Sequence, residues 1–216
     1  MGILFNKTAL TEGDFITVPS ATQYNLTTDI SMMCWVKFNV KATVGGTYNT
    51  FLSRNDIYTL QYAATADRVQ FSWNYGAGTW RAVEDTISPV GGTWYHFAGT
   101  YNKVITCIYR DGDLTNSANY TDTISSTVGT AITIGSNTTT DTTQFCRAIV
   151  ADMRIYNRAL SANEMNAVFA CRGHDGILSG LVGRWPLNEG VDTLSATTNV
   201  FYDVSDYKNN GSIVSA

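Results

Sequence analysis

The residues best suited to contact a ligand are the aromatic side chains of the segment Phe71–Trp80. Trp73, Tyr75 and Trp80 stand there among Asn and Gly residues around a turn. Flat aromatic faces stack on sugar rings, and neighbouring amides form hydrogen bonds at the sugar's rim. These three residues are therefore the candidate ligand-binding residues. Two other interpretations stay open, because half of an aromatic strand faces the core and because Trp and Tyr dominate protein–protein contacts.

The acidic residues and the two histidines form no recognisable catalytic set. Glu84-Asp85, Glu164 and Glu189 stand alone in the sequence, so no pair of carboxylates is indicated for general acid–base chemistry. His96 lies within a strand-like run, which predicts a hydrogen-bonded structural histidine. His174 lies in a Gly-His-Asp-Gly loop and is expected at a turn or on the surface. No catalytic residue is predicted, and the protein is expected not to be an enzyme.

The four cysteines stand far apart and form no CxxC pair. With only two histidines in the chain, they do not indicate a zinc site. Cys34, Cys107 and Cys146 fall in strand-like runs, which predicts small buried thiols. A disulfide between Cys107 and Cys146 is the alternative.

The composition excludes several classes of partner. Of 216 residues only 15% are charged, against about 25% in typical soluble domains. The net charge of −4 and the pI of about 5.0 leave no basic surface for nucleic acid. No stretch approaches about 18 consecutive apolar residues, so membrane insertion is not expected. The segment Met1–Lys7 lacks the features of a signal peptide.

The elements that must position these residues are mostly β-strands. With four Glu and five Lys, the chain is poor in helix formers, and its many β-branched residues favour strands. Ile30–Phe38 is apolar on both faces, as in a central strand between two layers. Asp111-Gly112 indicates a tight turn after the strand-like run Val104–Arg110. One helix is predicted to begin at Ser161, where Glu164 completes a capping box, and to end at Gly173.

Several segments resemble the laminin-G-like branch of the concanavalin A-like lectin/glucanase superfamily. The resemblance lies in their order and spacing, and the segments are Asp14–Pro19, Ser31–Lys37, Thr93–Tyr101, Ile108–Gly112 and Ala151–Ser161. It implies an all-β, concanavalin A-like jelly-roll sandwich of two antiparallel sheets with one short helix. The chain, residues 1–216, is expected to be a single domain of this kind.

The C-terminal segment 177–216 resembles the part that usually opens such a domain. Its family-like pieces are Leu181–Gly190, Asp203–Asp206 and Asn209–Gly211. A permuted order, in which the last strand fills the place of the first, explains its position. The alternative is the start of a second, truncated domain, which would leave Trp185 and Leu187 exposed.

The resemblance also implies a metal site and bears on catalysis. Relatives often hold calcium through Asp side chains and backbone carbonyls, which suit this hard ion. Asp152, Asp203, Asp206 and Asp14 are the candidate calcium ligands, and calcium is the one cofactor expected. The alternative is that these Asp residues make hydrogen bonds in turns. The glucanase pattern E-x-D-x-x-E is absent, because Glu12-Gly13-Asp14 has no Glu three residues later.

The expected function follows from the resemblance to stand-alone members found in virus particles, chiefly tailed phages. It is that of a non-enzymatic virion structural or decoration protein, located in the virion. Its lectin-like jelly roll would contact coat or capsid proteins, further copies of itself and, in some cases, host-surface glycans. The alternative is a calcium-dependent carbohydrate-binding, lectin-like module with an extracellular location.

Overall fold

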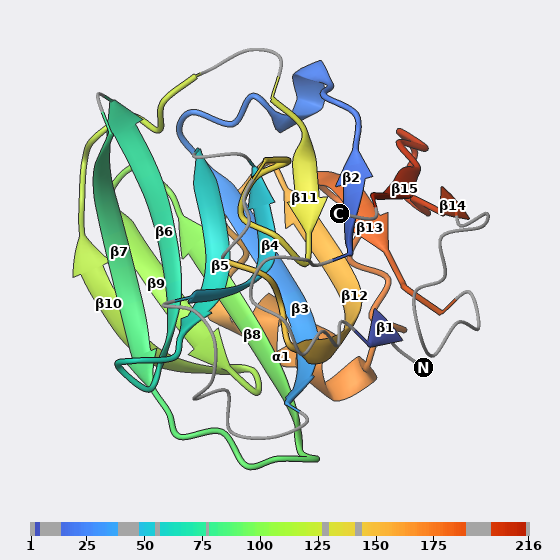
Figure 1. Ribbon diagram of the computed structural model, residues 1–216. Coiled ribbons are helices and arrows are strands. Elements are labelled where there is room, and N and C mark those ends of the chain that lie inside the picture. The colour runs from blue at the N-terminus through green and yellow to red at the C-terminus, as the bar shows by residue number, and fades with distance from the viewer. Residues whose placement is uncertain are drawn as a thin grey trace.

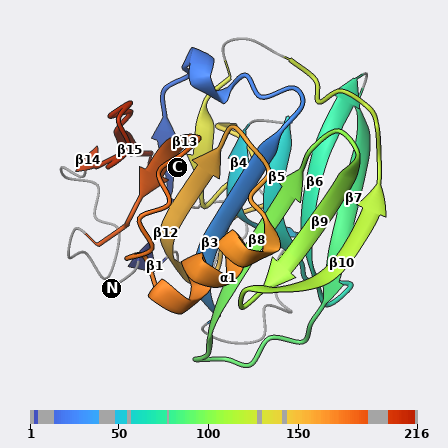
Figure 2. The same cartoon turned by 180° about the vertical axis from the view of Figure 1, so that it is seen from behind.

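The computed structural model describes residues 3–4, 14–38, 48–54, 57–76, 78–126, 130–140, 144–188 and 200–214. Two antiparallel sheets face each other in this part of the chain, and one α-helix lies on the outer side of one sheet (Figures 1 and 2). The predicted all-β class, with two antiparallel sheets and one short helix, is confirmed. The described residues contain no helix that is long and apolar enough to cross a membrane.

The sheet that carries the helix is here called the helix-side sheet. Its strands, in spatial order, are β1 (Ile3–Leu4), β12 (Ala148–Tyr156), β3 (Ile30–Phe38), β8 (Trp94–Tyr101), β9 (Ile105–Arg110) and β10 (Asp113–Asn119), and β13 (Leu181–Trp185) also pairs with β12. The other sheet is called the opposite sheet. Its order is β14 (Val200–Phe201), β15 (Gly211–Val214), β2 (Phe15–Val18), β11 (Ile132–Ile134), β4 (Tyr48–Arg54), β5 (Tyr58–Ala63), β6 (Arg68–Gly76) and β7 (Thr79–Thr86). A short 3-10 helix, η1 (Thr22–Tyr24), follows β2.

The central strand β3 is buried on both faces, which explains its continuous apolar run. Met32, Cys34 and Val36 point into the core between the two sheets. Met33, which lies between them in sequence, points to the other side and belongs to a second apolar cluster under the helix. This two-sided burial is the one predicted from the sequence.

Helix α1 (Ala162–Cys171) has the predicted boundaries and the predicted cap. Glu164 N–H donates to the Ser161 side chain, and the Glu164 carboxylate accepts from Ser161 N–H at 2.8 Å. The guanidinium of Arg158, together with these Ser161 bonds, lowers the pKa of Glu164 to about 2, although partial burial opposes the shift. The helix ends where Arg172 and Gly173 both adopt positive φ.

The turn between β9 and β10 was predicted, but the strand that follows it was not. Asp111 and Gly112 have φ of 53° and 87°, as a tight hairpin turn requires. Strand β10 pairs with β9, yet most of its residues are polar and most are exposed. A strand with no buried face has no apolar alternation, so the sequence pattern gave no sign of it.

The C-terminal segment contributes strands to both sheets. β13 pairs with β12, and β15 pairs with β2, which places the last strands beside some of the first. Trp185 is 0% exposed and Leu187 is 1% exposed, so the predicted strand and its burial are confirmed. At the other end of the chain, Ile3–Leu4 pairs with Ile149–Val150 of β12.

Cysteine placement agrees with the prediction of buried thiols. Cys34, Cys107 and Cys146 are buried, and all four cysteines are free thiols. Cys146 belongs to the core between the sheets, whereas Cys107 lies in the cluster under α1. The alternative disulfide between Cys107 and Cys146 is therefore not formed, because a sheet separates the two clusters.

The first prediction concerns the C-terminal strand β13. The Trp185→Ala substitution should lower the free energy of unfolding by about 3–5 kcal/mol, as expected when a large buried side chain is removed. Trp185 also loses the hydrogen bond from its Nε1 to the carbonyl oxygen of Asn209, at 3.0 Å. Urea denaturation followed by circular dichroism measures the change. Trp80→Ala is the matched control, because Trp80 is 38% exposed. Equal losses for both variants would contradict the placement of β13 in the core.

Candidate ligand-binding pocket

Trp73, the first residue of the predicted aromatic site, lies in the core. It is 0% exposed, its ring stacks on Tyr101 with centroids 4.3 Å apart, and its Nε1 donates to Thr106 Oγ1 at 3.3 Å. Both partners belong to the helix-side sheet, so Trp73 joins the two layers. Its prediction as a ligand-binding residue is corrected, because a fully buried ring has no face left for a sugar.

Tyr75 and Trp80 do not share one surface. Tyr75 is half-buried, packs against the core and lies under the guanidinium of Arg81, 4.3 Å from the ring centroid. Trp80 pairs with Asn74, and adjacent residues of a strand point to opposite faces, so Trp80 and Tyr75 lie on opposite sides of the sheet. Trp80 is exposed, and a binding role for it stays a prediction.

A cluster of ion pairs, here called the arginine–aspartate network, joins β12, β13 and the loop after α1. Asp152 Oδ2 accepts from Arg154 Nη2 at 2.6 Å, and Asp152 Oδ1 accepts from Arg184 Nε at 2.7 Å. The Arg154 side chain is 1% exposed and also donates to both oxygens of Asp175, at 3.1 and 2.9 Å. Arg184 Nη2 donates to the carbonyl oxygen of Gly173 at 2.8 Å.

The network keeps Asp152 ionised. Burial favours the neutral acid, but the guanidinium groups of Arg154 and Arg184 outweigh it and hold the pKa of Asp152 below its usual range. The acid of a glycosidase needs the opposite, a carboxyl group whose pKa is raised. Asp152 is therefore unsuited to donate a proton to a leaving group at neutral pH.

The four candidate calcium ligands do not form one site. Arginines occupy both oxygens of Asp152, and Asp203 accepts hydrogen bonds from three backbone N–H groups, those of Arg184, Ser205 and Asn209, each at 2.9 Å. Asp206 is exposed, and Asp14 lies just before β2. In the described ranges no three His, Cys, Asp or Glu residues could hold a metal ion together. These residues do not fit a calcium site, and calcium binding stays a prediction of the sequence.

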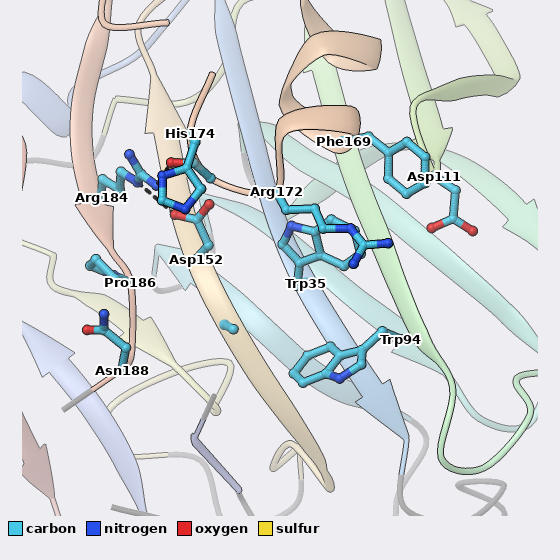
Figure 3. A pocket seen from close by; sticks show the side chains of 12 residues that line it. Trp35, Trp94, Asp111, Asp152, Phe169, Arg172, His174, Arg184, Pro186 and Asn188 are labelled. Carbon is cyan, nitrogen blue, oxygen red and sulfur yellow. Dashed lines mark hydrogen bonds and ion pairs between the residues drawn. The ribbon is translucent and has the colours of Figure 1, made fainter. Parts of the chain in front are cut away.

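A pocket of about 640 Å³, here called the α1 pocket, lies on the outer face of the helix-side sheet (Figure 3). The end of α1, the following loop and strands β3, β8, β12 and β13 contribute its walls. The lining residues are Trp35, Trp94, Asp111, Ala151, Asp152, Phe169, Arg172, Gly173, His174, Arg184, Pro186 and Asn188. The arginine–aspartate network forms one side of the pocket, and aromatic rings form another.

Strand alternation places the aromatic residues on this outer face. Trp35 follows the outward-pointing Met33 by two residues, and its ring stacks on Phe169 of α1 with centroids 5.5 Å apart. Trp94 pairs with Lys37, which also points outward, and Trp94 is 37% exposed. The pocket therefore combines an exposed aromatic face with charged and amide groups.

Three residues of the pocket have the left-handed backbone conformation that non-glycine residues seldom adopt. The φ angles are 53° at Asp111, 47° at Asp152 and 46° at Arg172. Asp152 lies in a β-bulge, because the pairing of β12 with β3 shifts between Ala151 and Arg154. Such backbone strain concentrates at functional sites in proteins. The hairpin turn and the helix end account for this conformation at Asp111 and Arg172, so the bulge at Asp152 is the position that supports the α1 pocket as the candidate site.

Sequence reasoning missed this pocket, although its parts carried signals. Asp111 was recognised only as a turn residue, and Trp35 and Trp94 only as parts of family-like strands. Trp94 is recognised as a pocket residue only from its pairing with Lys37, and strand pairing cannot be read from a single sequence. The signal for Arg172 was its position just before Gly173, which ends the helix.

His96 lies beneath the pocket, between its aromatic side chains. It is 1% exposed, its ring centroid is 5.3 Å from that of Trp35, and 6.4 Å from that of Phe169. His96 was predicted to be a hydrogen-bonded structural histidine, and the ring is buried in the structure, but its Nδ1 atom has no hydrogen-bond partner. Burial, with a contribution from the charge of Arg154, lowers the pKa of His96 to about 4. The ring is therefore neutral at physiological pH.

Comparison with known proteins identifies the family. A laminin-G-like family model, described as the concanavalin A-like lectin/glucanases superfamily, matches residues 10–166. No curated protein sequence matches this chain.

Three solved structures illustrate the likeness of the fold. A "putative carbohydrate binding protein" from Bacteroides ovatus has a TM-score of 0.67 and 16% identity, over 93% of this chain and 55% of that one. A heptameric SAP-like pentraxin from Limulus polyphemus has a TM-score of 0.58 and 13% identity, over 96% and 95%. The binding domain of botulinum neurotoxin serotype D has a TM-score of 0.59 and 15% identity, over 77% and 42%. This chain thus spans about half the length of the first and less than half of the third.

The second prediction concerns acid stability. Between pH 6.5 and 4 the unfolded chain binds a proton at His96 that the folded chain excludes, because the folded pKa is about 4. The free energy of unfolding should therefore fall as the pH is lowered through this window, by about 3 kcal/mol from this residue alone. Urea denaturation at pH 7 and pH 4 measures the loss. His96→Gln and His96→Phe lack this titration and should lose less stability than the wild type. An identical loss in all three proteins would contradict the assignment.

Proposed function

This chain belongs to the concanavalin A-like lectin/glucanases superfamily, and we propose that it binds carbohydrate in the α1 pocket without cleaving it. The observation that carries the proposal is the pocket itself, whose lining combines the exposed ring of Trp94 with Arg172, Asp111 and Asn188. Sugar-binding sites need the same combination, since one face of a sugar ring is apolar and its edge carries hydroxyl groups.

The polar groups of the pocket suit the hydroxyl groups of a sugar. Asp111 Oδ1 accepts a hydrogen bond from His96 N–H at 2.8 Å, which fixes the carboxylate at the rim. A carboxylate accepts further hydrogen bonds, and the amide of Asn188 both donates and accepts. The exposed Asn188 lies beside Pro186 on the far side of the pocket from Asp111 (Figure 3). A ring stacked on Trp94 would meet polar groups on two sides.

The structural neighbours support a binding function. The Bacteroides ovatus protein is described in terms of carbohydrate binding, and the neurotoxin fragment is described as a binding domain. At sequence identities of 16% and 15%, these neighbours show only that the fold is shared. The proposal for this chain therefore rests on its own pocket.

The carboxylates of the pocket favour binding over hydrolysis. A glycosidase needs one protonated and one ionised carboxyl group beside the scissile bond. Asp152 is held ionised by two arginines, and its oxygens point into the network rather than toward free space. The proposal is accordingly that of a lectin-like protein, and the virion and extracellular locations stay predictions.

The third prediction tests the pocket with two tryptophans of equal exposure. Trp94→Ala should weaken binding of any glycan found on a glycan array by about tenfold or more, because a stacked aromatic face is removed. Titration calorimetry measures the affinity. Trp80→Ala is the matched control, since Trp80 is 38% exposed and Trp94 is 37% exposed, but on different sheets. A loss with Trp80→Ala alone would move the binding site to the surface predicted from the sequence, and no binding to any glycan would refute the proposal.

The second candidate function is the virion structural role, in which the chain contacts coat proteins or copies of itself. The observation that favours it is a row of exposed apolar side chains at and after β14, the terminal strand of the opposite sheet among those described. Val200, Tyr202, Val204 and Tyr207 are 45%, 58%, 47% and 49% exposed. Exposed apolar groups gathered at one sheet edge are typical of protein contacts.

The fourth prediction separates the two candidates. If the row of apolar residues makes protein contacts, light scattering should detect self-association or binding to capsid shells, and a Tyr202→Ser/Tyr207→Ser variant should lose it. Leu114→Ser is the control, because Leu114 is 52% exposed on the distant strand β10. A monodisperse monomer that ignores shells but binds an oligosaccharide would leave only the lectin-like function.

A further inference from the structure

We propose that the sugar bound in the α1 pocket carries a carboxylate group and that Arg172 binds it. The inference rests on the proposed function, because it names the class of carbohydrate for the same pocket. The observation behind it is the distribution of charge in the pocket. The charges of the arginine–aspartate network are paired with one another, whereas Arg172 lies outside this network.

Arg172 is a cation of the pocket that is unpaired within the part of the chain that the structure describes. It forms the C-cap of α1 with φ of 46°, is exposed and lines the pocket. Its guanidinium makes no hydrogen bond or ion pair with any residue of the described ranges, whereas Arg154 and Arg184 are each paired with Asp152. In Figure 3 it lies between the arginine–aspartate network and Asp111. The five donors of Arg172 are therefore available to a ligand.

The arginine–aspartate network does not neutralise Arg172. It contains two guanidinium groups, those of Arg154 and Arg184, and two carboxylates, those of Asp152 and Asp175, so its charges balance. Both oxygens of Asp152 already accept hydrogen bonds within the network. The charge of Arg172 is left without a counterion on this side of the pocket.

Asp111 is another charged residue of the pocket that is not part of the arginine–aspartate network. It lines the pocket, but it forms no ion pair with Arg172, and one of its oxygens accepts from the backbone of His96. A ligand that matches both groups must bring an anion to Arg172 and hydroxyl donors to Asp111. A neutral sugar satisfies only Asp111.

Acidic sugars have this combination of groups. Uronic acids and sialic acids carry a ring, several hydroxyl groups and one carboxylate. A planar guanidinium binds a carboxylate through two parallel hydrogen bonds, which single out this anion by geometry as well as by charge. The ring would stack on Trp94 while its carboxylate pairs with Arg172 and its hydroxyls donate to Asp111.

The test compares acidic sugars with neutral partners of the same skeleton by titration calorimetry at low salt. The probes are trigalacturonic acid and its methyl ester for uronic acids, and 3′-sialyllactose and lactose for sialic acids. The wild type should bind the acidic member of one pair about tenfold more tightly than the neutral member. The pair that shows the preference identifies the source of the carboxylate. The preference should shrink as salt is added.

Two variants of equal charge decide whether Arg172 is responsible. Arg172→Gln should abolish the preference for the acidic member of the pair, because the guanidinium that pairs with the carboxylate is removed. Lys103→Gln is the matched control, because Lys103 is also exposed with positive φ, 63°, and it lies in the turn at the far end of β8 from Trp94. Lys103→Gln should retain the preference.

The outcomes separate this inference from the proposed function. If the neutral members bind as tightly as the acidic ones, or if Arg172→Gln keeps the preference, the inference is overturned while carbohydrate binding stands. If none of the four probes binds, the inference is also overturned, and carbohydrate binding is then judged by the glycan array and the Trp94→Ala variant.

Discussion

The burial of Arg154 is the constraint on which the geometry of the pocket depends. A guanidinium that is 1% exposed must be paired with carboxylates, because an unpaired buried charge costs several kcal/mol. Asp152 reaches it from the β-bulge on the same strand, and Asp175 reaches it from the loop after α1. Through Asp152 the pairing extends to Arg184 on β13. One buried cation thus fixes a bulge, a loop and a neighbouring strand relative to each other.

This pairing also decides which chemistry remains at the surface. Both carboxylate oxygens of Asp152 accept hydrogen bonds from arginines of the network. Asp152 is therefore unsuited to coordinate calcium or to donate a proton. The carboxylate of Asp203 is likewise occupied, because it accepts hydrogen bonds from backbone N–H groups. What the network leaves free are a guanidinium at Arg172, a carboxylate at Asp111 and the ring of Trp94. These are groups that bind ligands.

Much of the fold was predictable from the sequence, and the site was not. Burial patterns and caps are local, so the strand Ile30–Phe38 and the capping box of Ser161 could be recognised. Strand β10 could not, because it buries no face. Trp73 was assigned to a ligand because alternation does not say which face of a strand is the inner one. The α1 pocket joins residues from positions 35 to 188, and only strand pairing brings them together.

The pocket exists because α1 covers only part of the outer face of its sheet. A helix of ten residues is about 15 Å long and 10 Å wide, whereas the nine-residue strand β3 extends for about 30 Å. Met33 and its neighbour Ala98 lie under the helix and are fully buried. Farther along the same two strands, Trp35 is half-buried against Phe169, and Trp94 is exposed. The cap at Arg172 therefore has two effects, since it ends the cover over the aromatic residues and places a free cation at the edge of the uncovered surface.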